Sequence, residues 1–187
     1  MLNVSQLESG IKLAFAAGED GAESDEVAVE LADAIVSYGS GAEILMLPGP
    51  ILIPAAPSPL PSSGNGAKLT VKTAESGRSA LEAGIKGQFS AGDPTMNLLA
   101  MAIFAYANSS FTVFSSTIGH TATGATLMAV PPILAPVVAA GTAGQDRDSC
   151  AALMANIIHT SFSTSIFNGA GVASDGGLGA VAGQKLM

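Results

Sequence analysis

The sequence predicts an α+β fold built from internally duplicated helix-helix-strand units, with a partial third copy, a Pro-rich arm and a Gly-rich C-terminal tail. Residues 5–18 match residues 79–92 at nine of fourteen positions, with a constant offset of 74. Apolar residues in these segments follow helical spacing, and runs of strand-forming residues come later in each unit. We divide the chain into a first unit with the Pro-rich arm at 1–61, a linker at 62–78, a second unit at 79–142, and a partial third unit with the tail at 143–187.

Each unit is expected to open with a short amphipathic helix. Ser5 with Glu8, and Ser79 with Glu82, have the spacing of a capping box, in which the serine and glutamate side chains satisfy free amides of the first turn. These two segments therefore predict two equivalent helix starts.

Two pairs of glycines recur in these helices. Gly18 and Gly92 lie where a glycine at a helix C-terminus belongs. Gly10 and Gly84 lie in mid-helix, where glycine costs about 1 kcal/mol relative to alanine. Their recurrence predicts a close approach of the backbone to another element.

The second helix of each unit carries the repeated pattern Leu-Ala-x-Ala-Ile-x-x-Tyr, at 31–38 and at 99–106. The segment 98–107 is apolar all round, which predicts a buried helix. Residues 143–146 echo residues 17–20, and 153–158 resembles the two Leu/Ala/Ile helices, so a third copy is expected there.

Strand-forming residues follow at 42–47 and 111–118. We expect the two repeats to pack about a pseudo-twofold axis. Ten apolar residues at helical spacing are predicted to share one core: Leu7, Ile11, Phe15, Leu31, Ile35, Leu81, Ile85, Phe89, Leu99 and Ile103.

Composition excludes several functional classes. The chain has 15 acidic and 7 basic residues, for a formal charge of −8, which argues against nucleic acid as a partner. A single Cys excludes an internal disulfide framework, and no secretory signal is recognisable.

Charges are scarce and unevenly spread. They make up 12% of the chain, against about 25% in average proteins, and residues 94–145 contain none. The longest helix-like apolar run, 98–107, is half the length of about 20 residues that a membrane span needs, so no membrane span is expected. Assembly with copies of itself or other proteins remains, because large exposed apolar patches mark interaction sites. We predict an assembly interface at Phe111, Val113, Phe114, Val137 and Val138, with the arm at 48–61 and the tail as reaching elements.

No catalytic, cofactor-binding or metal-binding residues are predicted, and we expect no enzyme. The segment 119–126 has phosphate-loop spacing but carries Ala125 where the lysine belongs. His120 and His159 lack further ligands at zinc-site spacing. The acidic segment 19–30 does not match an EF-hand, and whether it binds a cation stays open. Cys150 is expected to be a buried small side chain.

These features together resemble structural proteins of tailed-bacteriophage virions, in neck, tail, baseplate or capsid-decoration positions. The helices at 31–38 and 99–106 and the Gly-rich end at 168–183 carry the resemblance. It implies a homo-oligomer that contacts other virion proteins, made in the host cytoplasm and located in the virion. Position, copy number, symmetry and neighbours stay open. The alternatives are a self-assembling shell or ligand-binding module of cellular origin, or a membrane-associated protein.

Overall fold

The structure is a computed structural model of the chain. It describes the backbone of residues 2–45, 68–71, 75–110, 114–115, 121–128, 131–172 and 178–185. It describes the surroundings of the side chains for residues 2–43, 77–108 and 131–166.

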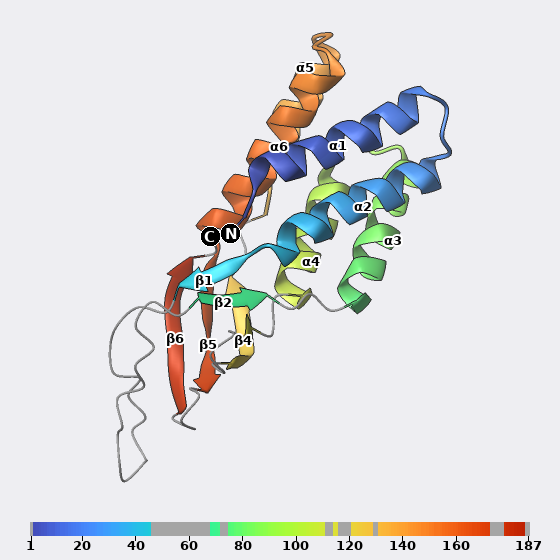
Figure 1. Cartoon of the computed structure of the whole chain (residues 1–187). Helices are drawn as coiled ribbons and strands as arrows, with labels where there is room; N and C mark the ends of the chain where they lie inside the picture. The colour runs from blue at the N-terminus through green and yellow to red at the C-terminus, as the bar shows by residue number, and fades with distance from the viewer. Residues whose placement is uncertain are drawn as a thin grey trace.

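In the described part of the chain, six helices form three consecutive hairpins (Figure 1). In each hairpin the two helices pack against each other, and further contacts join α1 to α6 and α2 to α3. The helices are α1 (Val4–Glu19), α2 (Ser24–Ser40), α3 (Glu75–Ala91), α4 (Asn97–Ser110), α5 (Ala135–Thr142) and α6 (Arg147–Thr164).

Two strands follow each hairpin, and the six strands pair in chain order in one antiparallel sheet. The sheet lies at one end of the helices, where α2 contacts β2 and α4 contacts β4 (Figure 1). The strands are β1 (Glu43–Leu45), β2 (Lys68–Val71), β3 (Phe114–Ser115), β4 (Thr121–Met128), β5 (Ile166–Val172) and β6 (Leu178–Lys185).

The α+β prediction is wrong for the body of the molecule. Of the residues whose side-chain surroundings are described, 78% are helical and no complete strand lies among them. Within the described residues, the strand-forming runs at 42–47 and 111–118 contain β1 and β3; residues 46–47, 111–113 and 116–118 lie outside the described part of the chain. The described hydrophobic core comes almost entirely from the helices, because their apolar stripes face one another.

The predicted core is largely correct. Eight of the ten residues are buried, with exposed fractions of 2% or less, and they belong to one cluster. The exceptions are Phe15, which is half-buried against that cluster, and Phe89, which is 37% exposed. Both phenylalanines lie near the C-terminal end of the first helix of their hairpins, where the core is open.

Most buried positions of the second helices of the three hairpins correspond. A shift of 68 residues takes Leu31, Ala32 and Ile35 of α2 to their buried counterparts in α4, and a shift of 123 takes them to buried counterparts in α6. The resemblance expected at 153–158 thus falls within α6. The three sets are Leu31, Leu99 and Met154; Ala32, Ala100 and Ala155; and Ile35, Ile103 and Ile158.

The first helix of the third hairpin is only half as long as the other two. The shift of 123 takes Lys12, in the middle of α1, to Ala135, where α5 begins. In the described structure, each unit consists of two helices followed by two strands, and its boundaries differ from the expected ones. The strand β2 and the start of α3 lie in the predicted linker 62–78, and α5 lies in the predicted second unit.

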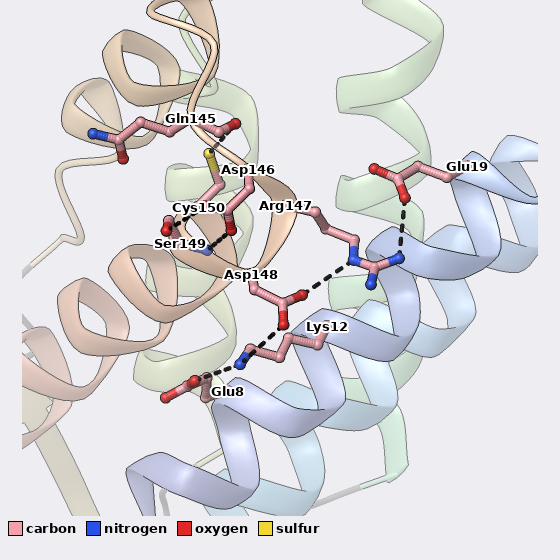
Figure 2. A network of polar contacts seen from close by, with 9 residues as sticks. All are labelled: Glu8, Lys12, Glu19, Gln145, Asp146, Arg147, Asp148, Ser149 and Cys150. Atoms are coloured by element: carbon pink, nitrogen blue, oxygen red, sulfur yellow. Dashed lines mark hydrogen bonds and ion pairs between the residues drawn. The ribbon is translucent and has the colours of Figure 1, made fainter.

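Ion pairs show how the hairpins are arranged. Lys86 of α3 pairs with Asp25 of α2, with 3.3 Å between Nζ and Oδ2. At the corresponding positions, Lys12 of α1 pairs with Asp148 of α6 at 3.6 Å, and Arg147 pairs with Glu19 beside it (Figure 2). The first helix of one hairpin thus packs on the second helix of another, and the same contact occurs twice. The three hairpins are therefore arranged head to tail. The predicted pseudo-twofold pairing of two repeats is wrong, because α1 packs against α6 of the third hairpin while α2 packs against α3.

The helix ends differ from the predicted capping boxes. Helix α1 begins at Val4, before Ser5. The Asn3 side chain accepts hydrogen bonds from the amides of Ser5 and Gln6, so Asn3 and not Ser5 is the cap. Glu8 instead forms an ion pair with Lys12. Ser79 likewise lies inside α3 and is not its cap, because that helix begins at Glu75.

The predicted C-terminal glycine is right in one hairpin and wrong in the other. Gly92 has a φ of 60° directly after α3, as expected. Gly18 lies inside α1, and the positive φ of 90° falls on Gly21. Gly144, after α5, is the counterpart of Gly21.

Candidate functional site

The second hairpin presents a largely uncharged surface to solvent. The four charged side chains between Gly77 and Asn108 are all partly buried, and every residue there that is more exposed is neutral; the four are Arg78, Glu82, Lys86 and Asp93. Within this surface, a groove of about 490 Å³ runs between α3 and α4. We call its lining the neutral face and define it by Ala80, Gly84, Gly87, Leu98, Met101, Ala102 and Ala105.

Two large apolar side chains form one edge of the neutral face. Leu98 is 45% exposed and Met101 is 57% exposed, and they lie one helical turn apart on α4. The prediction that 98–107 forms a buried helix is therefore wrong: its inner positions are buried, but Leu98 and Met101 on this side of α4 are exposed.

At the base of the groove, between Gly84 and Ala102, α3 and α4 approach each other closely. A Cβ atom on Gly84 would lie 2.5 Å from the Cβ of Ala102, which is too short for two carbon atoms. The same contact occurs in the first hairpin, where a Cβ on Gly10 would lie 2.6 Å from that of Ala34. The predicted close approach at these glycines is thus confirmed.

The corresponding surface of the first hairpin carries charged side chains, although Leu13, at the position of Gly87, is 66% exposed there. Glu30 and Asp33 occupy the positions of Leu98 and Met101. Asp33 accepts a hydrogen bond of 2.6 Å from Nε of Arg78.

The groove of the first hairpin is also bridged. At the positions of Ala80 and Ala105 stand Gln6 and Ser37, and Nε2 of Gln6 donates a 2.9 Å hydrogen bond to Oγ of Ser37. The neutral face therefore distinguishes one hairpin from its own duplicate.

A second hollow, of about 460 Å³, lies where the short α5 approaches the junction of α3 and α4. Phe15 and Phe89 border it, and the shift of 123 puts Val138 at the third corresponding position. Beside it, Gln88 is 5% exposed, donates to the carbonyl oxygen of Asp93 and accepts from the Leu99 amide, which joins α3 to the start of α4.

The predicted interface residues are not brought together in the described structure. Phe111 and Val113 lie outside the described residues, and only the backbone of Phe114 is described, in β3. Val137 is 4% exposed and belongs to the core, at the position of Ala14 and Gln88, so it is not a surface residue as predicted. Val138 is half-buried and lines the second hollow.

Polar groups near the helix starts act as caps. The Asp93 carboxylate accepts hydrogen bonds from the hydroxyl and amide of Thr95 and from the first amides of α4, and these bonds hold the pKa of Asp93 below its usual value. Asp146 caps α6 through Ser149, which lowers its pKa in the same way (Figure 2). Both carboxylates are thereby used in local structure.

Buried polar groups join the hairpins. Oη of Tyr38 lies 2.6 Å from Nδ1 of His159, which connects α2 to α6. Burial raises the pKa of the phenols of Tyr38 and Tyr106, which are each 1% exposed. His120, the other histidine, lies outside the described residues.

The remaining candidates from the sequence meet different outcomes. Cys150 is buried, as predicted. In the described part of the chain, no three His, Cys, Asp or Glu side chains gather as a metal site. Of the segment 119–126, only the backbone within β4 is described.

No described helix has both the length and the apolar character needed to cross a membrane. Comparison with family models, with curated proteins and with solved structures finds no match to this chain.

The sequence pattern did not identify Leu98 and Met101 as contact residues. The signal that points to them is the replacement of Glu30 and Asp33 between two repeats whose buried positions agree.

Proposed function

We propose that this protein is a non-enzymatic structural protein that assembles with copies of itself, as a multi-copy component of a tailed-bacteriophage virion. The observation that carries the assembly is the neutral face, where Leu98 and Met101 are exposed in a groove without a charged lining residue. An exposed apolar surface of this kind is stabilised when a partner removes it from water.

The resemblance of the helices at 31–38 and 99–106 to virion proteins supports the particular setting. Other virion proteins are then the further partners, and the virion is the location. A self-assembling shell of cellular origin would use the same neutral face. Electron micrographs of the purified protein, alone and with virion proteins, distinguish closed shells from rings or tubes.

Light scattering coupled to size-exclusion chromatography tests the assembly. The single chain has a mass of 18.5 kDa, and we expect a mass that increases with concentration toward a multiple of that value. A constant mass of one chain at millimolar concentration would contradict the proposal.

Flotation with liposomes tests the membrane alternative. Protein that floats in the lipid fraction would support membrane association.

Ligand binding is a second candidate, which the hollow beside Val138 supports. Its volume of about 460 Å³ falls within the range of roughly 300–1,000 Å³ typical of small-molecule sites, and apolar side chains line most of it. Titration with an apolar fluorescent dye measures this capacity. Saturable binding that Val138→Phe abolishes would support a ligand site, and unsaturable binding would exclude it.

A further inference from the structure

We infer that two copies of the chain pair through their neutral faces about a twofold axis. Leu98 and Met101 of each copy then insert between α3 and α4 of the other, over Ala80, Gly84 and Gly87. This inference rests on the self-assembly proposed above and names the surface and geometry that perform it.

The first step is that the hairpin does not need apolar residues at these two positions. The first hairpin has buried residues at most of the corresponding positions and the same close glycine-alanine contact, and it carries Glu30 and Asp33 there. Leu98 and Met101 therefore add nothing that folding of the hairpin requires. Exposing them is unfavourable in water, and contact with a partner removes that cost.

The second step is that the neutral face carries both a ridge and a trough. The ridge is Leu98 and Met101 on α4, and the trough beside it is lined by small residues and by the buried Tyr106. A Cβ on Gly87 would meet nothing within 4 Å, so the trough is open. A twofold interface needs a surface that is complementary to itself, which a ridge next to a trough provides.

The third step is charge. The chain carries a net charge of −8, and seven exposed acidic residues lie on the first hairpin, from Glu19 to Asp33. The four basic side chains in the described regions are already paired with carboxylates of the same chain. Two copies that met through the first hairpins would bring carboxylates together. The neutral face avoids this repulsion and favours a second copy as the occupant.

The size of the face sets the expected strength. A stable interface buries about 800 Å² on each partner, from 20 or more residues. Fourteen residues of the second hairpin are exposed, so the neutral face falls below this size. We therefore expect a dimer in rapid, concentration-dependent exchange with the monomer.

Sedimentation equilibrium of charge variants tests the surface. Met101→Asp and Leu98→Glu each give the second hairpin the residue that the first hairpin carries, so we expect folding to be retained. Each substitution should raise the dimer dissociation constant by about tenfold or more, because it buries a carboxylate without a partner. Leu13→Asn is the control, because Leu13 is 66% exposed on the first hairpin, and this variant should dimerise like the wild type.

Disulfide cross-linking tests the geometry. A chain with both Ala80→Cys and Met101→Cys should form a covalent dimer under mild oxidation, since the ridge of one copy meets the trough of the other. Each single variant should cross-link far less. The matched control is Gln6→Cys with Asp33→Cys on the first hairpin, which should remain uncross-linked, and circular dichroism checks that every variant is folded.

The outcomes separate this inference from the proposed function. A wild-type chain that stays monomeric at every concentration contradicts both. A wild-type chain that self-associates, with Leu98→Glu and Met101→Asp unchanged in mass, contradicts only the pairing through the neutral face. Efficient cross-linking by Met101→Cys alone would also overturn it, because ridges would then meet ridges.

Discussion

Leu31 and Ile35 of α2 fill the same core positions as Leu99 and Ile103 of α4, yet the outer sides of the two helices have opposite character. The first hairpin presents carboxylates and a hydrogen bond across its groove, whereas the second presents leucine, methionine and small residues. The comparison teaches that buried positions alone are enough to specify this hairpin. Its surface was free to diverge, and that divergence is where function is to be sought.

The third hairpin extends the comparison. The buried positions of α6 agree with those of α2 and α4, but α5 has 8 residues where α1 has 16. The contacts of α1 with α6 and of α3 with α2 each carry an ion pair. The hollow beside Val138 lies where the short α5 approaches α4. Shortening one helix thus opened a space at the junction without altering the core of its partner.

The largest expected effect comes from the shared core. Leu31→Ala and Leu99→Ala should each lower the free energy of unfolding by about 2–5 kcal/mol, because each leaves a cavity at a buried position. Chemical denaturation followed by circular dichroism measures both. A loss below about 1 kcal/mol for only one of them would break the equivalence of the two hairpins.

The close glycine contacts should give a smaller effect. Gly10→Ala and Gly84→Ala each force a Cβ against an alanine of the neighbouring helix, which costs about 1–3 kcal/mol and outweighs the gain in helix propensity. Gly87→Ala is the matched control: it meets open space and should stabilise the chain by up to about 1 kcal/mol. Adding Ala102→Gly to Gly84→Ala should restore stability. Thermal unfolding compares all four, and a stabilising Gly84→Ala would refute the close approach.

Filling the hollow tests the contribution of the shortened α5. Val138→Phe restores the aromatic residue found at the two corresponding positions and should raise the free energy of unfolding by about 0.5–2 kcal/mol. Phe89→Val is the reverse change and should lower it. Denaturation midpoints measure both, and destabilisation by Val138→Phe would mean that the hollow does not accept a third ring.

The smallest effect concerns the start of α4. The hydrogen bonds to Asp93 lower its pKa in the folded chain, so its contribution to stability is present above the ordinary carboxyl pKa of about 4 and is lost as the pH falls through the lower folded value. Asp93→Asn should therefore reduce the loss of stability on acidification. Glu23, the N-cap residue of α2, makes no side-chain cap hydrogen bond, so Glu23→Gln is a control that removes a carboxylate without removing a cap bond. Melting temperatures between pH 6 and pH 2 compare the variants, and identical curves for wild type and Asp93→Asn would contradict the assignment.

Local signals predicted part of this structure. The spacing of Leu7, Ile11 and Leu81 identified core positions because a helix places residues three and four apart on one face. The capping boxes failed because Ser5 and Ser79 lie inside their helices, and the competing cap, Asn3, satisfies the first amides of α1. The α+β class was wrong for the described core because strand propensity does not reveal which residues enter the core, and that core comes from the helices. The interface at Val137 failed for the same reason: its helix turns it inward.

The sequence by itself determined that the chain repeats, most of the buried positions of the first two hairpins, and the close approaches at Gly10 and Gly84. These properties follow from helical periodicity and from the small size of glycine, which act within a few residues of the chain. Only the tertiary structure decided that three hairpins pack head to tail, that α6 takes the place beside α1, and that the apolar outer side of α4 faces solvent. Those outcomes depend on which surfaces distant in the sequence come into contact. Leu98 and Leu99 are adjacent in the sequence, yet Leu98 is exposed and Leu99 is buried, because neighbouring residues of a helix point about 100° apart.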